Sequence, residues 1–326
     1  GRITGRVDSS PSSGIQRSQL AVRSDAIRAR SLGRVVVIDP IELVATVSSD
    51  RGQIKAERFN WKSAFGTAVG QGDLRSGNAD IEIDFGRLTS MLRPIVQISE
   101  TTLAGAARGT IQWNASRDNV WRLSGRGSAS DLLITLPSGQ ILKRPSMTGE
   151  IEAEGRWGGQ SLDELTRADV TLASSGLDLH AELVQAVPRP SVTIPMPIRV
   201  RGKGRMETIA ETLGPWLPQE LHDVAGGFSV SARGEVSTAT QRLTSAAIEL
   251  TQPKAGYGNR FFSQPRVKVH FDGDYLVPSG DFHARSLTVA GDAFSVAAQG
   301  VSTREEIDLE VKWRAKLERL QGCLLY

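Results

Sequence analysis

The chain has 326 residues, of which 39% are hydrophobic and 23% are charged, as in folded proteins with a sizeable apolar core. Its 39 basic and 36 acidic residues nearly balance and the basic ones are scattered, which argues against a nucleic-acid-binding role. A single cysteine, Cys323, excludes an internal disulfide framework and a cluster of thiolate metal ligands.

The ends of the chain predict that it is a fragment of a longer protein. It begins at Gly1 without a methionine, a signal peptide or an apolar anchor, and it stops shortly after what reads as the start of another unit. The longest strongly apolar run, residues 35–38, is far shorter than the roughly 20 residues of a membrane-spanning helix. We therefore expect no spanning segment within these residues.

Most of the sequence alternates apolar with polar residues, which is the pattern of half-buried strands. Glycine, serine, asparagine and aspartate separate the runs, and the 33 glycines suit turns and bulges. The pattern predicts one strand in each of 79–85, 131–136, 192–201, 227–234, 246–251, 266–273 and 307–313, and a strand pair in each of 61–72 and 287–300.

Two segments carry helical spacing instead. In residues 86–96 the apolar side chains recur at helix offsets, and Pro94 limits the length of the helix. In residues 204–221 they do so again, and the Gly-Pro pair at 214–215 ends the helix. Each helix directly follows a predicted strand, and residues 309–320 begin a third junction of this kind.

These junctions predict an internal repeat. Gly86 and Gly204 are 118 positions apart, and later pairs such as Gly139 with Gly258 differ by 118 to 121. Chance similarity among glycine-rich strands is the competing explanation. We predict a partial unit at 1–85, full units at 86–203 and 204–311, and the truncated start of a further unit at 312–326.

The predicted fold is mainly β. We expect an elongated, twisted antiparallel sheet, built from repeats and curled into a U-shaped, taco-like groove, with a few short helices. Because successive side chains of a strand point to opposite faces, one face of such a sheet is apolar and the other is wet.

The segments that carry the junctions resemble the AsmA-like superfamily of bacterial envelope proteins, which includes the TamB group. The resemblance lies in "DFGRLTSMLRP" (84–94), "VRGKGRMETIAETLGPWLP" (200–218), "LAGAARGTIQW" (103–113), "VAGGFSVSARGEV" (224–236) and "LTVAGDAFSVAAQG" (287–300).

This resemblance implies an apolar β-groove that is anchored in the inner membrane by an N-terminal helix and projects across the periplasm. It implies phospholipid transport toward the outer membrane, or support of outer-membrane biogenesis alongside outer-membrane assembly proteins. It supplies no catalytic residue and no cofactor, so we expect a non-enzymatic protein.

Strand parity suggests which side chains would face a lipid. An acyl chain needs a continuous apolar lane, because exposing one methylene to water costs about 0.8 kcal/mol. Taken singly, each candidate is more often an ordinary core residue. The candidates are Ile81, Ile83, Phe85, Val267, Val269, Phe271, Leu287, Val289, Phe294 and Val296.

His270 and His283 flank three aspartates, Asp272, Asp274 and Asp281, but their spacing matches no metal-ligand pattern, and an Asp-Gly turn accounts for residues 272–274. The sequence contains no nucleophile elbow, phosphate-binding loop or zinc spacing.

Two functions other than lipid transport remain. The alternative is a structural or adhesive β-repeat protein, either a surface protein or a carbohydrate-binding one, and it predicts a closed interior filled with side chains. A polysaccharide-acting enzyme would need a pair of acids in a cleft, and the sequence shows no privileged pair.

Overall fold

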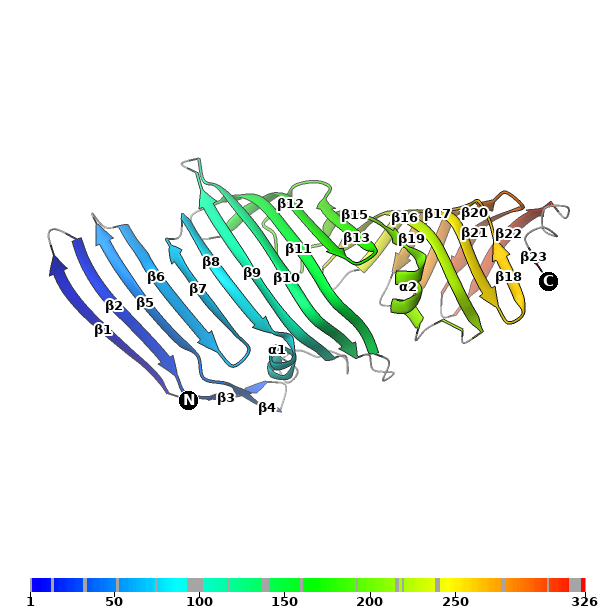
Figure 1. The fold of residues 1–326 in the computed structure, drawn as a ribbon. Helices are drawn as coiled ribbons and strands as arrows, with labels where there is room; N and C mark the ends of the chain where they lie inside the picture. Colours follow the sequence, from blue (N-terminus) through cyan, green and yellow to red (C-terminus); the bar gives the residue numbers. More distant parts are fainter. Residues whose placement is uncertain are drawn as a thin grey trace. The chain divides into compact units, whose positions relative to one another are not determined.

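The structure is a computed structural model that describes residues 2–12, 15–31, 34–50, 53–73, 75–92, 102–116, 118–135, 141–158, 161–191, 193–214, 217–218, 220–237, 241–276, 279–303, 305–316 and 324–325. The chain divides into two compact units, Gly1–Gly158 and Gly159–Tyr326, which we call unit 1 and unit 2. Both are mainly β, as predicted, with antiparallel strands, and the described residues of each unit include one short α-helix (Figure 1).

Unit 1 contains a sheet of nine strands in chain order, each antiparallel to the next. No described pairing joins the first strand to the last, so the sheet is open. A separate hairpin follows the second strand, and the helix α1 (Phe85–Leu92) follows the sixth. The sheet strands are β1 (Ile3–Ser12), β2 (Ile15–Ser24), β5 (Glu42–Asp50), β6 (Gln53–Ser63), β7 (Gly66–Gly72), β8 (Ser76–Asp84), β9 (Thr102–Ala115), β10 (Val120–Thr135) and β11 (Ile141–Trp157), and the hairpin is β3 (Ile27–Ser31) with β4 (Arg34–Ile38).

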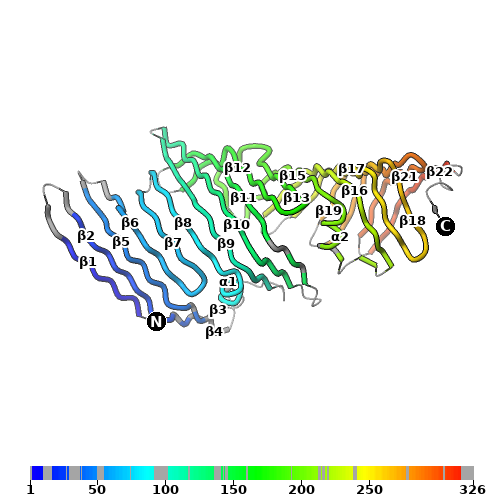
Figure 2. The backbone as a smooth tube through the Cα atoms, in the orientation of Figure 1, coloured from blue at the N-terminus to red at the C-terminus, as the bar shows by residue number. Residues whose placement is uncertain are grey.

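Unit 2 also contains nine antiparallel strands that are neighbours in chain order, and the helix α2 (Met206–Leu213) follows the third (Figure 2). Three short strands extend it: one pairs with the first strand, and the other two pair with each other beside the fifth. The main strands are β12 (Leu162–Ser174), β13 (Leu177–Leu183), β15 (Met196–Arg205), β16 (Leu221–Val236), β17 (Gln241–Tyr257), β19 (Arg266–Leu276), β20 (Asp281–Gly291), β21 (Phe294–Ser302) and β22 (Ile307–Ala315), and the short ones are β14 (Val187–Pro188), β18 (Arg260–Ser263) and β23 (Leu324–Leu325).

Both predicted helices are present, and the start of α1 shows why the sequence prediction was one residue late. The Asp84 carboxylate accepts a hydrogen bond from the Arg87 backbone amide at 2.9 Å, which places Asp84 at the N-cap. Phe85 therefore opens the helix and does not continue the strand, contrary to the predicted strand 79–85. Pro94 lies outside the described residues. The α2 helix ends before Gly214, as predicted.

The prediction of an Asp-Gly turn at residues 272–274 was wrong. These residues lie inside β19, and the chain turns only after Leu276. The pairing of β19 with β20 shifts between Asp272 and Gly273, which leaves Arg285 as the extra residue of a β-bulge. A Cβ atom at Gly273 would collide with the His283 carbonyl oxygen, so glycine serves a close approach of strands at this position.

Neither sheet is covered by a second layer that buries large side chains. Among the described residues only nine apolar side chains are buried, Pro253 included, and four of them are alanines. The accessible surface is 21605 Å², whereas two compact globules of half the mass would together expose about 16,000 Å². Within the described part of the chain, no helix is both long and apolar enough to cross a bilayer.

Two glycines, one in the first strand after each helix, have similar surroundings. Gly105 has a φ of +116°, and its Cβ position would lie 2.8 Å from the carbonyl oxygens of Ser130 and Asp131. Gly226 has a φ of +124°, and its Cβ position would lie 2.8–2.9 Å from the corresponding oxygens of Thr251 and Gln252. Both sites therefore exclude a side chain for the same two reasons, backbone conformation and steric contact.

We predict that Gly105→Ala and Gly226→Ala each lower the free energy of unfolding by about 3 kcal/mol, because each combines an unfavourable φ with a collision. Gly258→Ala is the matched control, since Gly258 has a φ of +58° and open space around its Cβ position. It should cost only about 1 kcal/mol. Urea denaturation monitored by circular dichroism measures all three, and equal losses would contradict the steric argument.

Candidate functional site: the apolar faces of the two sheets

The pairing register of unit 2 places apolar residues in continuous rows across the strands. Partners in an antiparallel pair point to the same face, so a row of successive partners shares one side of the sheet. Two adjacent rows cross all nine strands without a polar side chain. The first is Leu172, Leu179, Gly202, Val230, Ile248, Val269, Val289, Val296 and Trp313, and the second is Val170, Ala181, Val200, Ala232, Ala246, Phe271, Leu287, Ala298 and Val311.

The opposite face of unit 2 is polar along the same strands. On each strand, one residue lies between the members of the two apolar rows, and its side chain points to the opposite face. These residues form a row that contains His180, Arg201, Ser231 and His270. A further polar row contains Asp169, Glu182, Arg199, Arg233, Ser245 and Asp272. Unit 2 is therefore amphipathic across its thickness.

Unit 1 shows the same division. One apolar row crosses its nine strands through Val7, Leu20, Ala45, Phe59, Gly70, Ala79, Ile111, Gly125 and Ile151. A row on the other face consists of Arg23, Glu42, Lys62, Thr67, Glu82, Arg108, Ser128 and Thr148. We call the apolar sides of the two sheets the apolar face of unit 1 and the apolar face of unit 2.

Large side chains cover the glycines of these faces. A Cβ atom at Gly70 would lie 2.7 Å from the tip of the Phe59 ring, so that ring lies over the bare backbone. A Cβ atom at Gly202 would lie 2.8 Å from a Leu179 methyl and 2.9 Å from a Val230 methyl. Large residues beside glycines thus close the gaps within each row.

The structure places nine of the ten predicted lipid-facing residues on these faces. Ile81 and Ile83 lie on the apolar face of unit 1. The apolar face of unit 2 contains Val267, Val269, Phe271, Leu287, Val289, Phe294 and Val296. The tenth, Phe85, is half-buried at the start of α1.

Exposure differs among these residues. Phe271 is 6% exposed and stacks on Phe282 with ring centroids 5.2 Å apart, and Val267 is 5% exposed, so both act mainly as core. The other predicted residues are half-buried. On β22, which has a described partner on one side only, Ile307 and Trp313 are 74% and 73% exposed. The half-buried and exposed residues are the ones that a ligand can reach.

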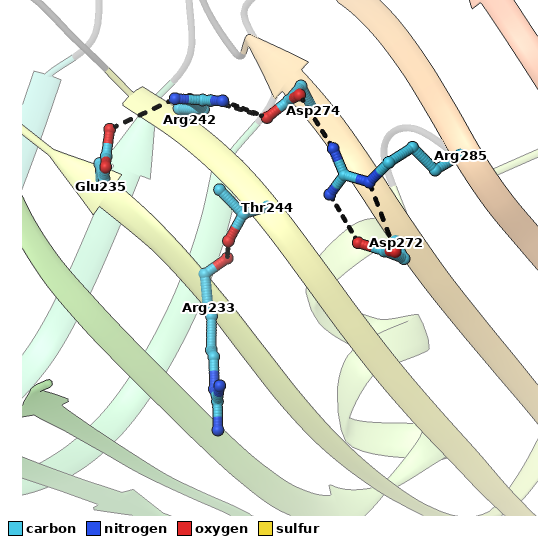
Figure 3. Close-up of polar contacts among 7 residues, drawn as sticks. All are labelled: Arg233, Glu235, Arg242, Thr244, Asp272, Asp274 and Arg285. Carbon is cyan, nitrogen blue, oxygen red and sulfur yellow. Dashed lines mark hydrogen bonds and ion pairs between the residues drawn. The ribbon is translucent and has the colours of Figure 1, made fainter.

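Two of the three aspartates that the sequence placed beside His270 and His283, Asp272 and Asp274, belong to an arginine network on the polar face of unit 2 (Figure 3), whereas the Asp281 carboxylate accepts a hydrogen bond from the Ser279 hydroxyl. Arg285 donates to Asp272 at 2.6 Å through Nη2, and Arg242 donates to Asp274 at 2.8 Å through Nε. The hydrogen bond from Arg285 lowers the pKa of Asp272 from its ordinary 3.8. These carboxylates are therefore engaged as ion pairs that link β17, β19 and β20.

A second polar group on this face went unnoticed in the sequence. Asp169, His180 and Glu182 bring one potential ligand atom each within 4.8 Å of one another. However, Arg167 pairs with Asp169 at 2.6 Å, and Arg199 and Arg201 pair with Glu182 at 2.7 and 3.0 Å. Since three guanidinium groups already hold the carboxylates, this arrangement suits ion pairing better than cation binding. The pairing register of β12 with β13 brings these three residues together, so their spacing in the sequence does not reveal the cluster.

We predict that Arg285→Gln raises the pKa of Asp272 toward 3.8, because the charged hydrogen bond that favours the carboxylate is lost. In the unmutated chain, the stabilisation from this lowered pKa is present above 3.8 and is lost as pH falls through the folded-state value. The variant should lose less stability over that interval.

Carboxyl-resolved NMR titration measures the Asp272 pKa, and acid denaturation measures the pH dependence. Arg233→Gln is the control, since Arg233 lies on the same face and forms no ion pair in the described part of the chain. An Asp272 titration that is identical in the unmutated chain and in Arg285→Gln would contradict the assignment.

Comparison of the chain with protein-family models, with curated proteins and with solved structures finds no match.

Proposed function

We propose that this chain binds the acyl chains of phospholipids on its apolar faces, without catalysing a reaction, and that it serves phospholipid transport between the inner and outer membranes of a bacterial envelope, or outer-membrane biogenesis. One observation carries the proposal. Uninterrupted apolar rows cross all nine strands of each sheet, and the opposite face is polar. Few of the large apolar side chains are buried.

The dimensions of a row suit an acyl chain. Nine strands at a spacing of about 4.8 Å give a lane of about 38 Å. The tails of one lipid fill half of a hydrocarbon core that is about 30 Å thick, so a lane exceeds the length of one tail. Ten methylene groups moved from water onto such a lane contribute about 8 kcal/mol, before the cost of immobilising the lipid.

The repeat and the U-shaped groove belong to the same proposal. Each helix follows a strand and precedes a long hairpin. Gly105 and Gly226 are 121 positions apart, and a Cβ atom at either would collide with two backbone carbonyl oxygens. These parallels support repeated blocks, although the boundaries at 1–85, 86–203, 204–311 and 312–326 stay a prediction. In this proposal each apolar face lines a curved groove whose open side admits the headgroup.

The proposed setting is the periplasm, with an inner-membrane anchor in another part of the protein. Periplasmic location and outer-membrane assembly partners follow from the sequence resemblance to AsmA-like proteins. The alternative, an adhesive or structural β-repeat protein, expects a closed and filled interior. The scarcity of buried large side chains in the described residues favours lipid binding over that alternative.

A photocrosslinking experiment tests lipid contact. A photoreactive residue at Val289, on the apolar face of unit 2, should form an adduct with radiolabelled phospholipid when the purified chain is incubated with it. The adjacent Thr288 points to the polar face and is the matched control. We expect at least fivefold more adduct at Val289, because only that side contacts the tails.

A second pair in unit 1 repeats the comparison at Ile81 and Glu82, which point to opposite faces of β8. Equal adduct yields from both faces in both units would overturn the proposal. Circular dichroism spectra of the four labelled chains establish that they are folded.

A further inference from the structure

The polar face of unit 2 contains a hollow of about 670 Å³ over the central strands β15, β16, β17 and β19. Its lining identifies the face. Thr171 lines the hollow, whereas Leu172, the next residue along β12, does not. Arg201 and Lys203, which are the polar-face neighbours of Gly202 on β15, both line it. Five residues of the first apolar row, Leu179, Gly202, Val230, Ile248 and Val269, also line it, each between two polar-face neighbours on its strand, whereas residues of the adjacent apolar rows such as Val200 and Phe228 do not. The hollow therefore opens on the side opposite to the apolar face.

The depth of the hollow comes from small side chains in the middle of longer ones. Ser229, Ser231 and Ala247 form the floor on β16 and β17. Arg201 and Lys203 rise from β15 on one side, and Lys268 and His270 rise from β19 on the other. Three strand spacings separate the two walls, which is about 14 Å between backbones. Side chains from both walls can therefore reach one ligand on the floor.

The hollow carries cations with unused hydrogen-bond donors. Lys268 forms no ion pair in the described part of the chain. Lys203 lies 3.8 Å from Asp178, which is beyond hydrogen-bond distance. Arg201 donates to Glu182 at 3.0 Å through Nη2, which leaves other N–H groups of its guanidinium free. All three side chains are exposed and can turn toward a ligand.

The carboxylates of the hollow do not cancel these charges. Three cations, Arg201, Lys203 and Lys268, face two anions, Asp178 and Glu249. Glu249 is already paired with Arg266 at 2.9 Å. Arg201 is likewise paired with Glu182, so the two outside partners cancel, and the hollow has a net charge of +1 that attracts an anion.

We propose that this hollow binds the phosphoryl group of a small molecule. A guanidinium fork and two ammonium groups are the usual donors to phosphate oxygens, and the serine hydroxyls of the floor add neutral donors. The volume lies within the range of about 300–1,000 Å³ for small-molecule sites, so the hollow holds more than phosphate alone. The site is independent of the proposed lipid lanes, because it lies on the other face of the sheet.

The first test is an NMR titration of the isotopically labelled chain with inorganic pyrophosphate and with ribose 5-phosphate, at low ionic strength. We expect saturable shifts of the amides of Ser229, Ser231 and Ala247 with both probes, and none with ribose. If the phosphorylated probes leave these amides unchanged, the proposal is overturned.

Two variants separate charge from shape. Lys268→Gln should weaken pyrophosphate binding at least fivefold, and Ala247→Leu, which fills the floor without removing a charge, should abolish it. Lys254→Gln is the control, since Lys254 is an exposed lysine of β17 outside the hollow. Equal affinities in all variants would show that pyrophosphate binds elsewhere and would overturn the site.

A vesicle arm distinguishes a lipid headgroup from a soluble phosphate ester as the source. Phosphatidylcholine vesicles with and without phosphatidylglycerol are added at matched lipid concentration. Binding that depends on phosphatidylglycerol and is lost in Lys268→Gln supports a headgroup as the occupant. Pyrophosphate binding without such vesicle binding supports a soluble phosphate ester. The crosslinking of Val289 is unaffected by Lys268→Gln if the two faces act separately, so either site can fail alone.

Discussion

The structure depends on one constraint, which is that every strand must keep its apolar residues in register with those of its neighbours. In an antiparallel pair a shift of one residue would turn a whole strand over and place charged groups among the apolar rows. Here Val230, Ile248 and Val269 are direct partners on three successive strands, and so are Ser229, Glu249 and Lys268 on the other side. The sheet is held as much by its two-sided pattern as by its hydrogen bonds.

This constraint explains where irregularities occur. β-Bulges add a residue without inverting the pattern beyond them, since the apolar rows resume on the same face. At the bulge of β20, Arg285 is the extra residue and reaches two aspartates of β19. The positive-φ glycines at 105 and 226 lie near comparable irregularities of their own strands. At β20, therefore, an ion-pair network forms where the ladder is interrupted.

A single amphipathic layer also separates two kinds of chemistry. In the proposed function, the apolar face offers wide lanes that accept flexible acyl chains with little discrimination among them. The polar face offers charged hydrogen-bond donors and a hollow whose outline depends on three small residues, Ser229, Ser231 and Ala247. Because side chains cannot cross the sheet, a ligand on one face could affect a ligand on the other only by changing the backbone or the twist of the sheet.

Much of this could be predicted from the sequence, because strand alternation and helix spacing are local properties. The alternation in residues 267–271 is enough to predict that Val267, Val269 and Phe271 share a face. The Gly-Pro pair at 214–215 likewise predicts the end of α2. Residues 272–274 misled the prediction because an Asp-Gly pair favours turns locally, whereas pairing on both sides keeps it extended. What only the tertiary structure decided is which faces join into rows and which charges meet. Arg242 and Asp274 are 32 residues apart, and the register of the β17–β19 pairing, with its shift between Leu243 and Ser245, brings them into contact.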